Sequence, residues 1–420
     1  MYNRVKGTQD FLDLTLFNFL INEAKKHFAL YNFTEISTPI LEPLELFQRS
    51  LGSETDVVTK EMYTIVSEDE HKLCLRPEAT ASCVRAFVNN NINTTPWKIF
   101  LWGPMFRHER PQKGRYRQFH QINMEIIGAH SILQDAHFIK MLDRFFNESL
   151  KLDAYALHLN FVGCAEDRTA YKVLLREFLT DNASGSCSLC LIRKDKNILR
   201  VFDCKNSGCQ DIYKSAPPIT DSLCTVCTLE WRDLKDNLEH LSVSYSYTPT
   251  LVRGLDYYDK TVFEFVDVGL GAQNTFCGGG RYNSLVKQVG GHDDQPSLGA
   301  SIGIERVLLL LENENHTEKL SLPAKPPLYV ILPLSAAQQA LALLLADELQ
   351  AHSLAVEILL EGDSLKSMLR KANKMGARYA LLVGQEEQEK KIVTVKDMVT
   401  GHEEKVAHRG LIEFFKTSAL

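Results

Sequence analysis

The apolar and polar positions of the chain follow two different periods. Apolar residues at helical spacing predict helices at residues 14–31, 79–87 and 136–150. Alternating or short apolar runs predict strands at residues 33–39, 73–76, 156–161, 241–247, 261–266 and 275–277, and a strand that becomes a helix over residues 297–311. Because strand follows strand through much of residues 1–325, we expect an α+β domain with a largely antiparallel sheet flanked by helices.

Two parts of the chain depart from this pattern. Residues 167–240 are helical and polar and hold six of the ten cysteines, so they are predicted to be an insertion. A polar, proline-ended linker is expected at residues 312–326. Beyond it, strand and helix alternate at residues 328–332, 336–352, 355–359, 364–375 and 379–383. This alternation predicts a second domain, residues 327–420, of the α/β class with a mostly parallel sheet.

The composition is that of a globular protein of the cytoplasm. Of the 420 residues, 45% are hydrophobic and 24% are charged. No run approaches the roughly 20 apolar residues of a membrane span, and the N-terminus lacks the apolar core of a signal peptide. A net charge of -6 argues against promiscuous nucleic-acid binding, including DNA, but permits an RNA partner at a local basic patch.

One run of eleven residues, 107–117, is strongly basic. Five of these residues are Arg or Lys, and the apolar runs 99–102 and 122–127 on either side predict two strands joined by a basic loop. In an acidic protein such a cluster repels itself unless an anion neutralises it. Strand alternation would place Arg107 and Glu109 on one face, where both can meet one ligand. An exposed charged hairpin tip is the alternative interpretation.

Two further arginines share the setting of Arg107. Arg253 stands beside Gly254 and two tyrosines, and Arg306 lies where a glycine-spaced strand turns into a helix, a position that suits phosphate. A lone arginine is usually a surface salt bridge, but three in glycine-rich or aromatic segments favour one polyanion site. The glycine triplet 278–280 admits a ligand close to the backbone, although neither of the two commonest nucleotide loops is present.

Carboxylates and an amide accompany the arginines. Glu78 stands at a strand-to-helix junction. Gln121 and Glu125 lie four residues apart on a predicted strand, so they point to the same side as Phe119. A carboxylate among so many arginines is expected to hold a cationic or hydrogen-bond-donating group of the substrate.

The cysteines of the insertion have the spacing of metal ligands. They form the series Cys187-x2-Cys190, Cys204-x4-Cys209 and Cys224-x2-Cys227. Two CxxC pairs favour a structural Zn²⁺, with Cys187, Cys190, Cys224 and Cys227 as the predicted ligands. Four ligands suffice and six are present, so another four of the six, or reduced thiols without a metal, are the alternatives.

A basic stripe is predicted in the second domain. Lys366, Arg370 and Lys374 recur every four residues on one helix face, with Leu365, Leu369, Ala372 and Gly376 toward the other. By itself this stripe is an ordinary solvated face, although it also suits an RNA-docking module.

Five segments together resemble the histidyl-tRNA synthetase family of class II aminoacyl-tRNA synthetases. They are residues 6–10, 106–119, 251–258, 277–282 and 298–306, and the resemblance covers nearly the whole chain. It implies ATP-dependent ligation of L-histidine to tRNA(His) through a histidyl-adenylate, with release of AMP and pyrophosphate. It also implies Mg²⁺ bound with ATP, a homodimer whose interface includes residues 33–39, and a C-terminal domain that contacts the anticodon.

The resemblance also assigns roles to residues. It makes Arg107 and Arg253 the catalytic arginines at the α-phosphate. It places histidine against Glu78, Ala79, Thr80, Gln121, Glu125, Arg253, Tyr257 and Tyr258. It places ATP against Arg107, Glu109, Phe119 and Arg306. Contacts with tRNA are expected from Gln112, Arg115, Arg117, Lys366, Arg370 and Lys374. The alternative is a non-catalytic synthetase paralogue that acts as a regulatory or RNA-binding subunit, although such paralogues usually lack the C-terminal domain and the arginines.

Overall fold

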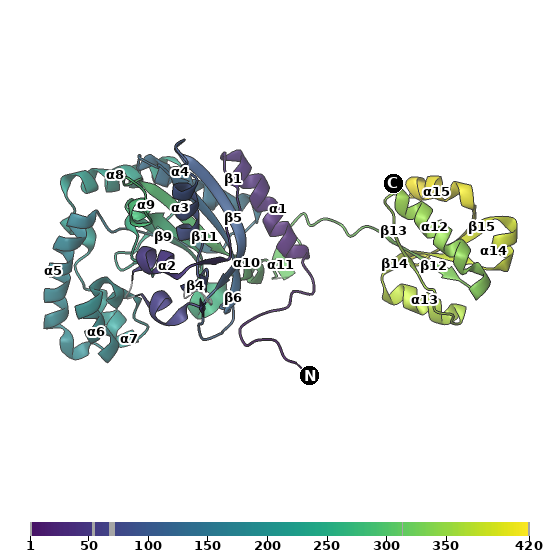
Figure 1. Ribbon diagram of the computed structural model, residues 1–420, viewed down its shortest axis with the longest axis horizontal. Coiled ribbons are helices and arrows are strands. Elements are labelled where there is room, and N and C mark those ends of the chain that lie inside the picture. The colour runs from purple at the N-terminus through teal and green to yellow at the C-terminus, as the bar shows by residue number, and fades with distance from the viewer. Residues whose placement is uncertain (1, 53–54, 67–71, 313, 419–420) are drawn as a thin grey trace. The chain divides into compact units, whose positions relative to one another are not determined.

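The computed structural model describes residues 2–52, 55–66, 72–312 and 314–418 (Figure 1). The chain folds as two compact units, Met1–Leu322 and Pro323–Leu420. Among the described residues, no helix has the length and apolar character needed to cross a membrane.

An eight-stranded sheet forms the centre of the first unit (Figure 1). Its strands are, in spatial order, β1 (Thr34–Glu35), β5 (Trp97–Phe106), β6 (Gln118–Ile127), β11 (Ser297–Gly303), β10 (Thr275–Arg281), β9 (Asp259–Asp267), β7 (Tyr155–Phe161) and β8 (Ser246–Tyr247). Only the two outermost pairs, β1–β5 and β7–β8, are parallel. The predicted largely antiparallel sheet is therefore confirmed.

One face of this sheet is covered by long helices. They are α1 (Thr15–Leu30), α4 (Leu133–Arg144), which continues as a π-helical turn (Phe145–Ser149), and α10 (Ile304–Leu311), followed by the short α11 (Glu314–Thr317). Alternate residues of β6 point to this side, where Ile122, Met124 and Ile126 are buried with Phe28 and Phe138. The aromatic-rich core here holds the sheet rigid.

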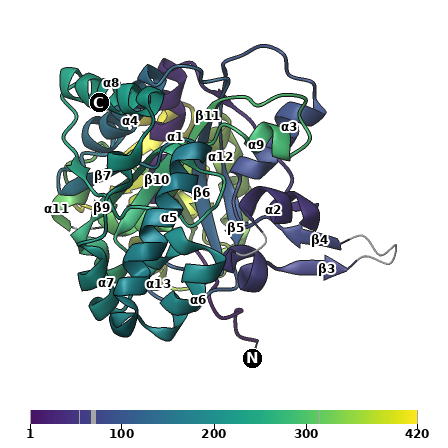
Figure 2. The ribbon, with the colours of Figure 1, turned by 90° about the vertical axis from the view of Figure 1, so that its left-hand side faces the viewer.

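The opposite face carries the polar residues of β6 and smaller elements. Helices α2 (Leu44–Leu51), α3 (Thr80–Asn89) and α9 (Leu285–Gln288) lie on this side, with a small sheet of β2 (Leu41–Pro43), β4 (Lys72–Leu75) and β3 (Thr64–Val66) (Figure 2). Ala79 and Cys83 at the start of α3 pack against Ile99 and Leu101 of β5. Gln121 and Glu125 point into the space that these elements enclose, because they alternate with the buried apolar residues of β6.

The insertion is helical, as predicted. It contains α5 (Ala165–Asp181), α6 (Ser188–Lys196), a 3₁₀ turn (Ile198–Asp203), α7 (Ser207–Tyr213) and α8 (Thr225–His240), between β7 and β8. Helices α5, α6 and α7 lie together along one edge of the first unit (Figure 1). They enclose a small core of their own, with Tyr171, Leu175, Val201 and Tyr213.

The second unit is an α/β domain with a mixed sheet. Its strands are, in spatial order, β13 (Ala355–Ile358), β12 (Leu328–Pro333), β14 (Ala377–Val383), β15 (Ile392–Asp397) and β16 (Glu403–Ala407). Its helices are α12 (Gln339–Ala351), α13 (Leu365–Lys374), α14 (Gln385–Lys390) and α15 (Leu411–Ser418). The first three strands are parallel, as predicted, but β15 and β16 form an antiparallel hairpin. The hairpin escaped prediction because exposed Glu and Lys residues hide the alternation of β16.

Some element boundaries also differ from the predictions. The strands expected at residues 33–39 and 241–247 are reduced to two residues each. The second is shortened because residues 241–242 end α8, with Ser242 in the left-handed region at φ 54°. The helix expected from residue 79 begins at Thr80, because the Glu78 carboxylate accepts the backbone N–H groups of Thr80 and Ala81 and so fixes the first turn there.

A fully buried ion pair joins the sheet to α4. Arg281, at the end of β10, binds Asp135 through Nη2 and through Nε at 3.1 Å, and it also donates to the carbonyls of Ala129 and Ser131. Arg281 is 2% exposed and Asp135 is not exposed at all. The arginine of the Gly-Gly-Gly-Arg segment is therefore a structural residue.

Replacing Asp135 by Ala should lower the free energy of unfolding of the first unit by about 3–5 kcal/mol, because it leaves a buried guanidinium without its counter-charge. The measurement is urea unfolding followed by tryptophan fluorescence, since Trp97, Trp102 and Trp231 all lie in this unit. Asp211→Ala, which removes an exposed pair with Lys214, is the control and should cost less than about 1 kcal/mol. Equal effects of the two changes would contradict the structural role of Arg281.

Candidate active site

Arg107, Arg253 and Arg306 converge on the polar face of the sheet. Arg107 follows β5, Arg253 precedes β9, and Arg306 lies in the first turn of α10. Burial lowers the pKa of Arg306 to about 10, and repulsion by Arg115 and Arg107, with a smaller part from Arg253, acts in the same direction. Burial also lowers the pKa of Arg107, and Arg253 adds to that effect. The structure thus brings together the three arginines that the sequence singled out.

Backbone carbonyls and aromatic rings hold two of these guanidinium groups in place. Arg107 donates from Nε to the carbonyl of Pro77 at 2.9 Å, and its guanidinium carbon lies 5.4 Å from the centre of the Phe119 ring. Arg306 donates from Nε to the carbonyl of Gly114 at 3.0 Å and from Nη1 to the carbonyl of Thr275. Carbonyls orient these cations but do not cancel their charge, so the site remains suited to an anion.

Arg253 has a closer carboxylate partner than Arg107 has. Its Nη1 is paired with Glu264 of β9, whose other oxygen accepts from the Thr275 hydroxyl at 2.8 Å. The guanidinium carbon lies 5.8 Å from the centre of the Tyr258 ring. The guanidinium group lies flat against the sheet at Gly278, where a Cβ atom would stand 2.5 Å from Nη1. Gly278 is therefore explained by the space that this side chain occupies, whereas a Cβ atom at Gly279 or Gly280 would collide with the backbone carbonyl of Gly299 or Thr261.

Glu125 lies on β6, on the same face of the strand as Gln121. It is completely buried, accepts from the Thr80 hydroxyl at 2.7 Å and also accepts from the Tyr282 hydroxyl. Burial raises the pKa of the Glu125 carboxyl to about 8, while the two hydrogen bonds act in the opposite direction. Gly299 on the neighbouring strand leaves the room that this carboxylate fills, since a Cβ atom there would collide with Oε2.

Three tyrosines pack together beside Glu125. The ring of Tyr257 lies edge-on to that of Tyr282, with centres 5.7 Å apart, and contacts the ring of Tyr258 at 4.5 Å. Burial raises the pKa of Tyr257 well above its ordinary value. Its neutral phenol can therefore donate or accept a hydrogen bond to a ligand.

Several buried polar atoms have no hydrogen-bond partner among the described residues, and two of them matter here. They are the side-chain oxygen Oε1 of Gln121 and the nitrogen Nε of Arg253. Because an unpaired buried polar atom is costly, each such atom needs an explanation, and a ligand is one. Here one is an acceptor and the other a cationic donor, a combination that suits the ammonium and carboxylate groups of an amino acid.

Some predicted site residues have different surroundings from those expected. The Ala79 side chain is buried in the core beneath α3 rather than in the pocket. Both oxygens of Glu78 are engaged in capping α3, at 2.7 and 2.9 Å from its backbone N–H groups. Arg107 and Glu109 do lie together, with Nη1 and Oε1 4.0 Å apart, but in the loop after β5 and not on one strand face, because β5 ends at Phe106.

The basic loop 107–117 is partly neutralised from within. Glu109 pairs with Arg115, and Arg117 donates from Nε to the carbonyl of Glu109 at 3.2 Å. Gln112 is exposed, whereas Arg115 and Arg117 are half-buried. Of the three residues predicted to contact tRNA here, only Gln112 presents its side chain openly to solvent.

Sequence reasoning missed two residues of the site, Tyr282 and Glu264. Tyr282 ends the Gly-Gly-Gly-Arg-Tyr segment, and Glu264 is a charged residue within the apolar run 262–266 of β9. A charge inside an apolar run was therefore the available signal for Glu264, since a partly buried charge requires a partner.

The basic stripe of the second unit is exposed as predicted. Lys366, Arg370 and Lys374 all face solvent on α13. The apolar side of the helix agrees with the prediction at Ala372, which is buried, but Met368 is buried as well and Leu365 remains exposed.

The cysteines divide into two groups that differ from the predicted set. Cys187 and Cys190 lie with Cys204 and Cys209. Cys224 and Cys227 lie instead with Cys164 and Asp167, near the starts of α5 and α8. The predicted combination of Cys187, Cys190, Cys224 and Cys227 is wrong, because the two CxxC turns begin different helices, α6 and α8, and each meets other partners.

Comparisons with known proteins agree with this geometry. A family model described as histidyl-tRNA synthetase matches residues 18–307, and one described as an anticodon binding domain matches residues 329–418. The histidine–tRNA ligase of Syntrophotalea carbinolica is 40% identical over 412 residues, 97% of this chain and 96% of that protein. That of Thermodesulfovibrio yellowstonii is 40% identical over 419 residues, 99% and 98% of the two chains. The crystal structure of apo S. aureus histidyl-tRNA synthetase is similar with a TM-score of 0.81 and 30% identity, covering 99% of this chain and all of that one.

The raised pKa of Glu125 predicts a pH-dependent stability. The folded protein keeps this proton up to about pH 8, whereas an ordinary glutamate loses it near 4.5. Because the folded state binds the extra proton between these values, this carboxyl makes the free energy of unfolding fall as pH rises through the window. The free energy of unfolding of the unchanged protein should therefore fall relative to that of Glu125→Gln as the pH rises from 5 to 8, by on the order of a few kcal/mol.

Urea unfolding at both pH values, followed by tryptophan fluorescence, measures this difference. Glu45→Gln, a change on an exposed helix side chain, is the control, and its difference from the unchanged protein should be the same at both pH values. A difference between Glu125→Gln and the unchanged protein that is the same at pH 5 and pH 8 would contradict a proton held on Glu125.

Proposed function

The chain belongs to the histidyl-tRNA synthetase family, and we propose that it ligates L-histidine to tRNA(His) in an ATP-dependent reaction through a histidyl-adenylate, releasing AMP and pyrophosphate. The unpaired atoms of Gln121 and Arg253, together with the buried carboxyl of Glu125, carry this proposal. They are an acceptor for an ammonium group and a donor for a carboxylate, and the buried carboxyl lies where a side chain with N–H groups can reach it.

Histidine selection follows from the pairing needs of an imidazole ring. Its two nitrogens require partners, and Glu125 together with the phenol of Tyr257 or Tyr282 supplies them. A side chain that lacks these nitrogens would make no hydrogen bond beyond those that Glu125 already accepts from Thr80 and Tyr282, and a site built for hydrogen bonds rejects such a side chain strongly. Thr80 holds Glu125 in position through its hydroxyl.

ATP would occupy the arginine-rich side of the site. Arg107 and Arg253 would flank the α-phosphate, Phe119 would stack on adenine, and Arg306 would bind the γ-phosphate. Guanidinium groups match phosphate oxygens through paired N–H donors, and burial strengthens these interactions. The mutual repulsion that lowers the pKa of Arg306 is relieved when the polyanion enters.

The first step needs alignment and charge neutralisation more than proton transfer. A carboxylate oxygen of histidine attacks the α-phosphorus, the bond to the bridging oxygen breaks, and pyrophosphate leaves. The carboxylate is already deprotonated, so arginines that hold the attacking and receiving groups supply most of the catalysis. In the second step the 3′-hydroxyl of the terminal tRNA adenosine attacks the acyl carbon, and AMP leaves.

Metal ions enter this proposal in two ways. Mg²⁺ would accompany the triphosphate and neutralise its charge, and Glu109 and Glu264 are the carboxylates beside the arginines that fit its preference for oxygen ligands. A Zn²⁺ held by cysteines of the insertion would be structural, because no open coordination position adjoins the reacting groups.

The domain roles and the assembly complete the proposal. Residues 1–325 would form the catalytic domain, with the insertion at about 167–240 and the linker at about 312–326, and residues 327–420 would contact the anticodon. The compact units Met1–Leu322 and Pro323–Leu420 support this division. A cytoplasmic homodimer through residues 33–39 is supported by the place of β1 at the edge of the sheet. No feature of the site favours a non-catalytic paralogue, since arginines and pocket residues are all present.

Arg253→Ala should slow histidyl-adenylate formation by about 10³-fold with little change in the KM for ATP, because the interaction of this arginine with the α-phosphate and the attacking carboxylate strengthens in the transition state. Histidine-dependent pyrophosphate exchange measures it. Arg253→Lys, which keeps the charge but loses the fork, should be intermediate, and Arg232→Ala, an exposed change on α8, should leave the rate unchanged. Near-normal exchange in Arg253→Ala would refute the assignment.

Replacing Lys366, Arg370 and Lys374 together by Ala should raise the KM for tRNA(His) by about tenfold, because each exposed cation contributes to phosphate binding. Pyrophosphate exchange, which does not require tRNA, should stay normal in the same variant. A matched triple change at Lys390, Lys396 and Lys405, elsewhere on the second unit, tests whether position matters. Equal effects of the two triple variants would reject the stripe on α13 as the contact surface.

A further inference from the structure

Four cysteines of the insertion converge without forming a disulfide. The sulfur atoms of Cys187, Cys190, Cys204 and Cys209 lie within 4.8 Å of one another, and all but Cys187 are buried. The Cys187 and Cys204 sulfurs are 3.7 Å apart, far beyond the roughly 2.05 Å of a disulfide bond. This separation of 3.7 Å is close to the sulfur–sulfur distance of about 3.8 Å in a tetrahedral site with Zn–S bonds of about 2.3 Å. We propose that these four thiolates bind one structural Zn²⁺.

The backbone around the cluster is arranged to support thiolates. Cys187 is the N-cap residue of α6, and its N–H donates to the sulfur of Cys209 at 3.2 Å. The N–H of Asn206 donates to the sulfur of Cys204 at 3.5 Å, and the Asn206 side chain in turn accepts from the N–H of Cys209 at 3.2 Å. N–H donors to sulfur of this kind orient the ligands of structural metal sites and stabilise their negative charge.

The second cysteine group has a different explanation. Asp167 accepts the N–H of Cys164 at 3.0 Å with one oxygen and the N–H of Cys224 at 2.7 Å with the other. Its carboxylate therefore caps the starts of both α5 and α8 and joins these helices without a metal. We accordingly assign one Zn²⁺ per chain and expect none at Cys164, Cys224 and Cys227.

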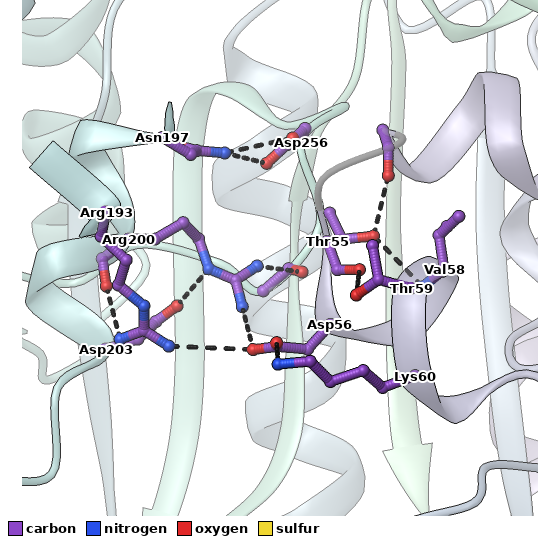
Figure 3. Close-up of polar contacts among 12 residues, drawn as sticks. Thr55, Asp56, Val58, Thr59, Lys60, Arg193, Asn197, Arg200, Asp203 and Asp256 are labelled. Carbon is purple, nitrogen blue, oxygen red and sulfur yellow. Dashed lines mark hydrogen bonds and ion pairs between the residues drawn. The ribbon is translucent and has the colours of Figure 1, made fainter. Parts of the chain in front are cut away.

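The metal would close a loop whose tip reaches the catalytic segment. Cys190 lies at the start of α6 and Cys204 just after the 3₁₀ turn, so the metal joins the two ends of the segment between them. At its tip, Asn197 donates to the two Asp256 oxygens at 3.0 and 3.2 Å, and Arg200 donates to the carbonyl of Gly254 at 2.6 Å (Figure 3). The segment therefore binds Gly254 and Asp256, two of the three residues that directly follow Arg253.

Further contacts extend this connection to another part of the first unit. Arg193 and Arg200 both approach Asp56, at 3.7 and 3.6 Å, and Arg200 also pairs with Asp203 at 2.8 Å (Figure 3). A cavity of about 460 Å³ lies between residues 195–200 and residues 252–256, with Arg253 and Tyr258 in its lining. The metal-closed segment forms one wall of this cavity, so we infer that the metal positions Arg253 for the proposed reaction. This positioning role depends on the proposed function, whereas the metal site does not.

Metal content of the full chain tests the site directly. Protein purified under reducing conditions and reconstituted with Zn²⁺ should retain one zinc per chain by plasma mass spectrometry. Replacement by Co²⁺ should give the intense visible bands and thiolate-to-cobalt absorption of a tetrahedral sulfur site. Cys209→Ser should lose the metal, and Cys224→Ser, the matched change in the other group, should keep it. Absence of zinc and of the cobalt bands in the unchanged protein would overturn the site, and so would loss of zinc from Cys224→Ser with retention in Cys209→Ser.

Histidine-dependent pyrophosphate exchange tests the positioning role. Arg200→Ala should raise the KM for histidine about tenfold or more while the KM for ATP stays nearly constant, since it loses a charged hydrogen bond to the Arg253 segment. Lys214→Ala, an exposed change in the same insertion, should leave both KM values unchanged. Zinc-depleted protein should behave like Arg200→Ala. An unchanged KM for histidine after loss of zinc would refute the positioning role but not the zinc site. Bound zinc with no exchange activity in any form would instead reject the proposed function.

Discussion

Electrostatic repulsion among half-buried arginines is the constraint on which the site depends. Partial burial and mutual repulsion both lower the pKa of Arg107, Arg115 and Arg306, so the charges of these three side chains oppose folding when nothing neutralises them. Glu109 and Glu264 offset part of the charge, and backbone carbonyls orient Arg107 and Arg306 without cancelling theirs. The remaining positive charge is the property that an anionic substrate satisfies, so the affinity of the site and the strain of the free protein have the same origin.

The sequence predicted this site well because charge and glycine are visible without coordinates. Three arginines in unusual settings, and a glycine triplet that no common nucleotide loop explains, already indicated one polyanion site. The surroundings of the individual side chains were less predictable from the sequence. Glu78, Ala79 and Thr80 are adjacent in the sequence, but Glu78 caps the first turn of α3. The sequence does not reveal that both Glu78 oxygens accept backbone N–H groups there. Tyr282 acquires its role from Glu125, which is 157 residues away in the sequence and two strands away in the sheet.

The same contrast holds for the fold and the cysteines. Strands with strongly alternating or apolar runs, such as β7 and β9, were predicted nearly to their ends, whereas β16 was missed because exposed charges hide its pattern. Cysteine spacing is a local property, and two CxxC turns look alike in the sequence. Their partners depend on which helix each turn begins, and Cys164 joins its group from the strand-to-helix junction before α5. Spacing can therefore suggest a metal but cannot choose its ligands.

The glycines under the pocket limit how this protein can be redesigned. On the sheet side, Gly278 and Gly299 carry no side chain that could be shortened, and any Cβ atom there collides with Arg253 or Glu125. A pocket for a bulkier amino acid must therefore be carved from Tyr257, Tyr258 or Tyr282, at the cost of the contacts that recognise the ring. Libraries that randomise the strand floor would consist mainly of non-functional members, and engineering effort belongs on the aromatic walls.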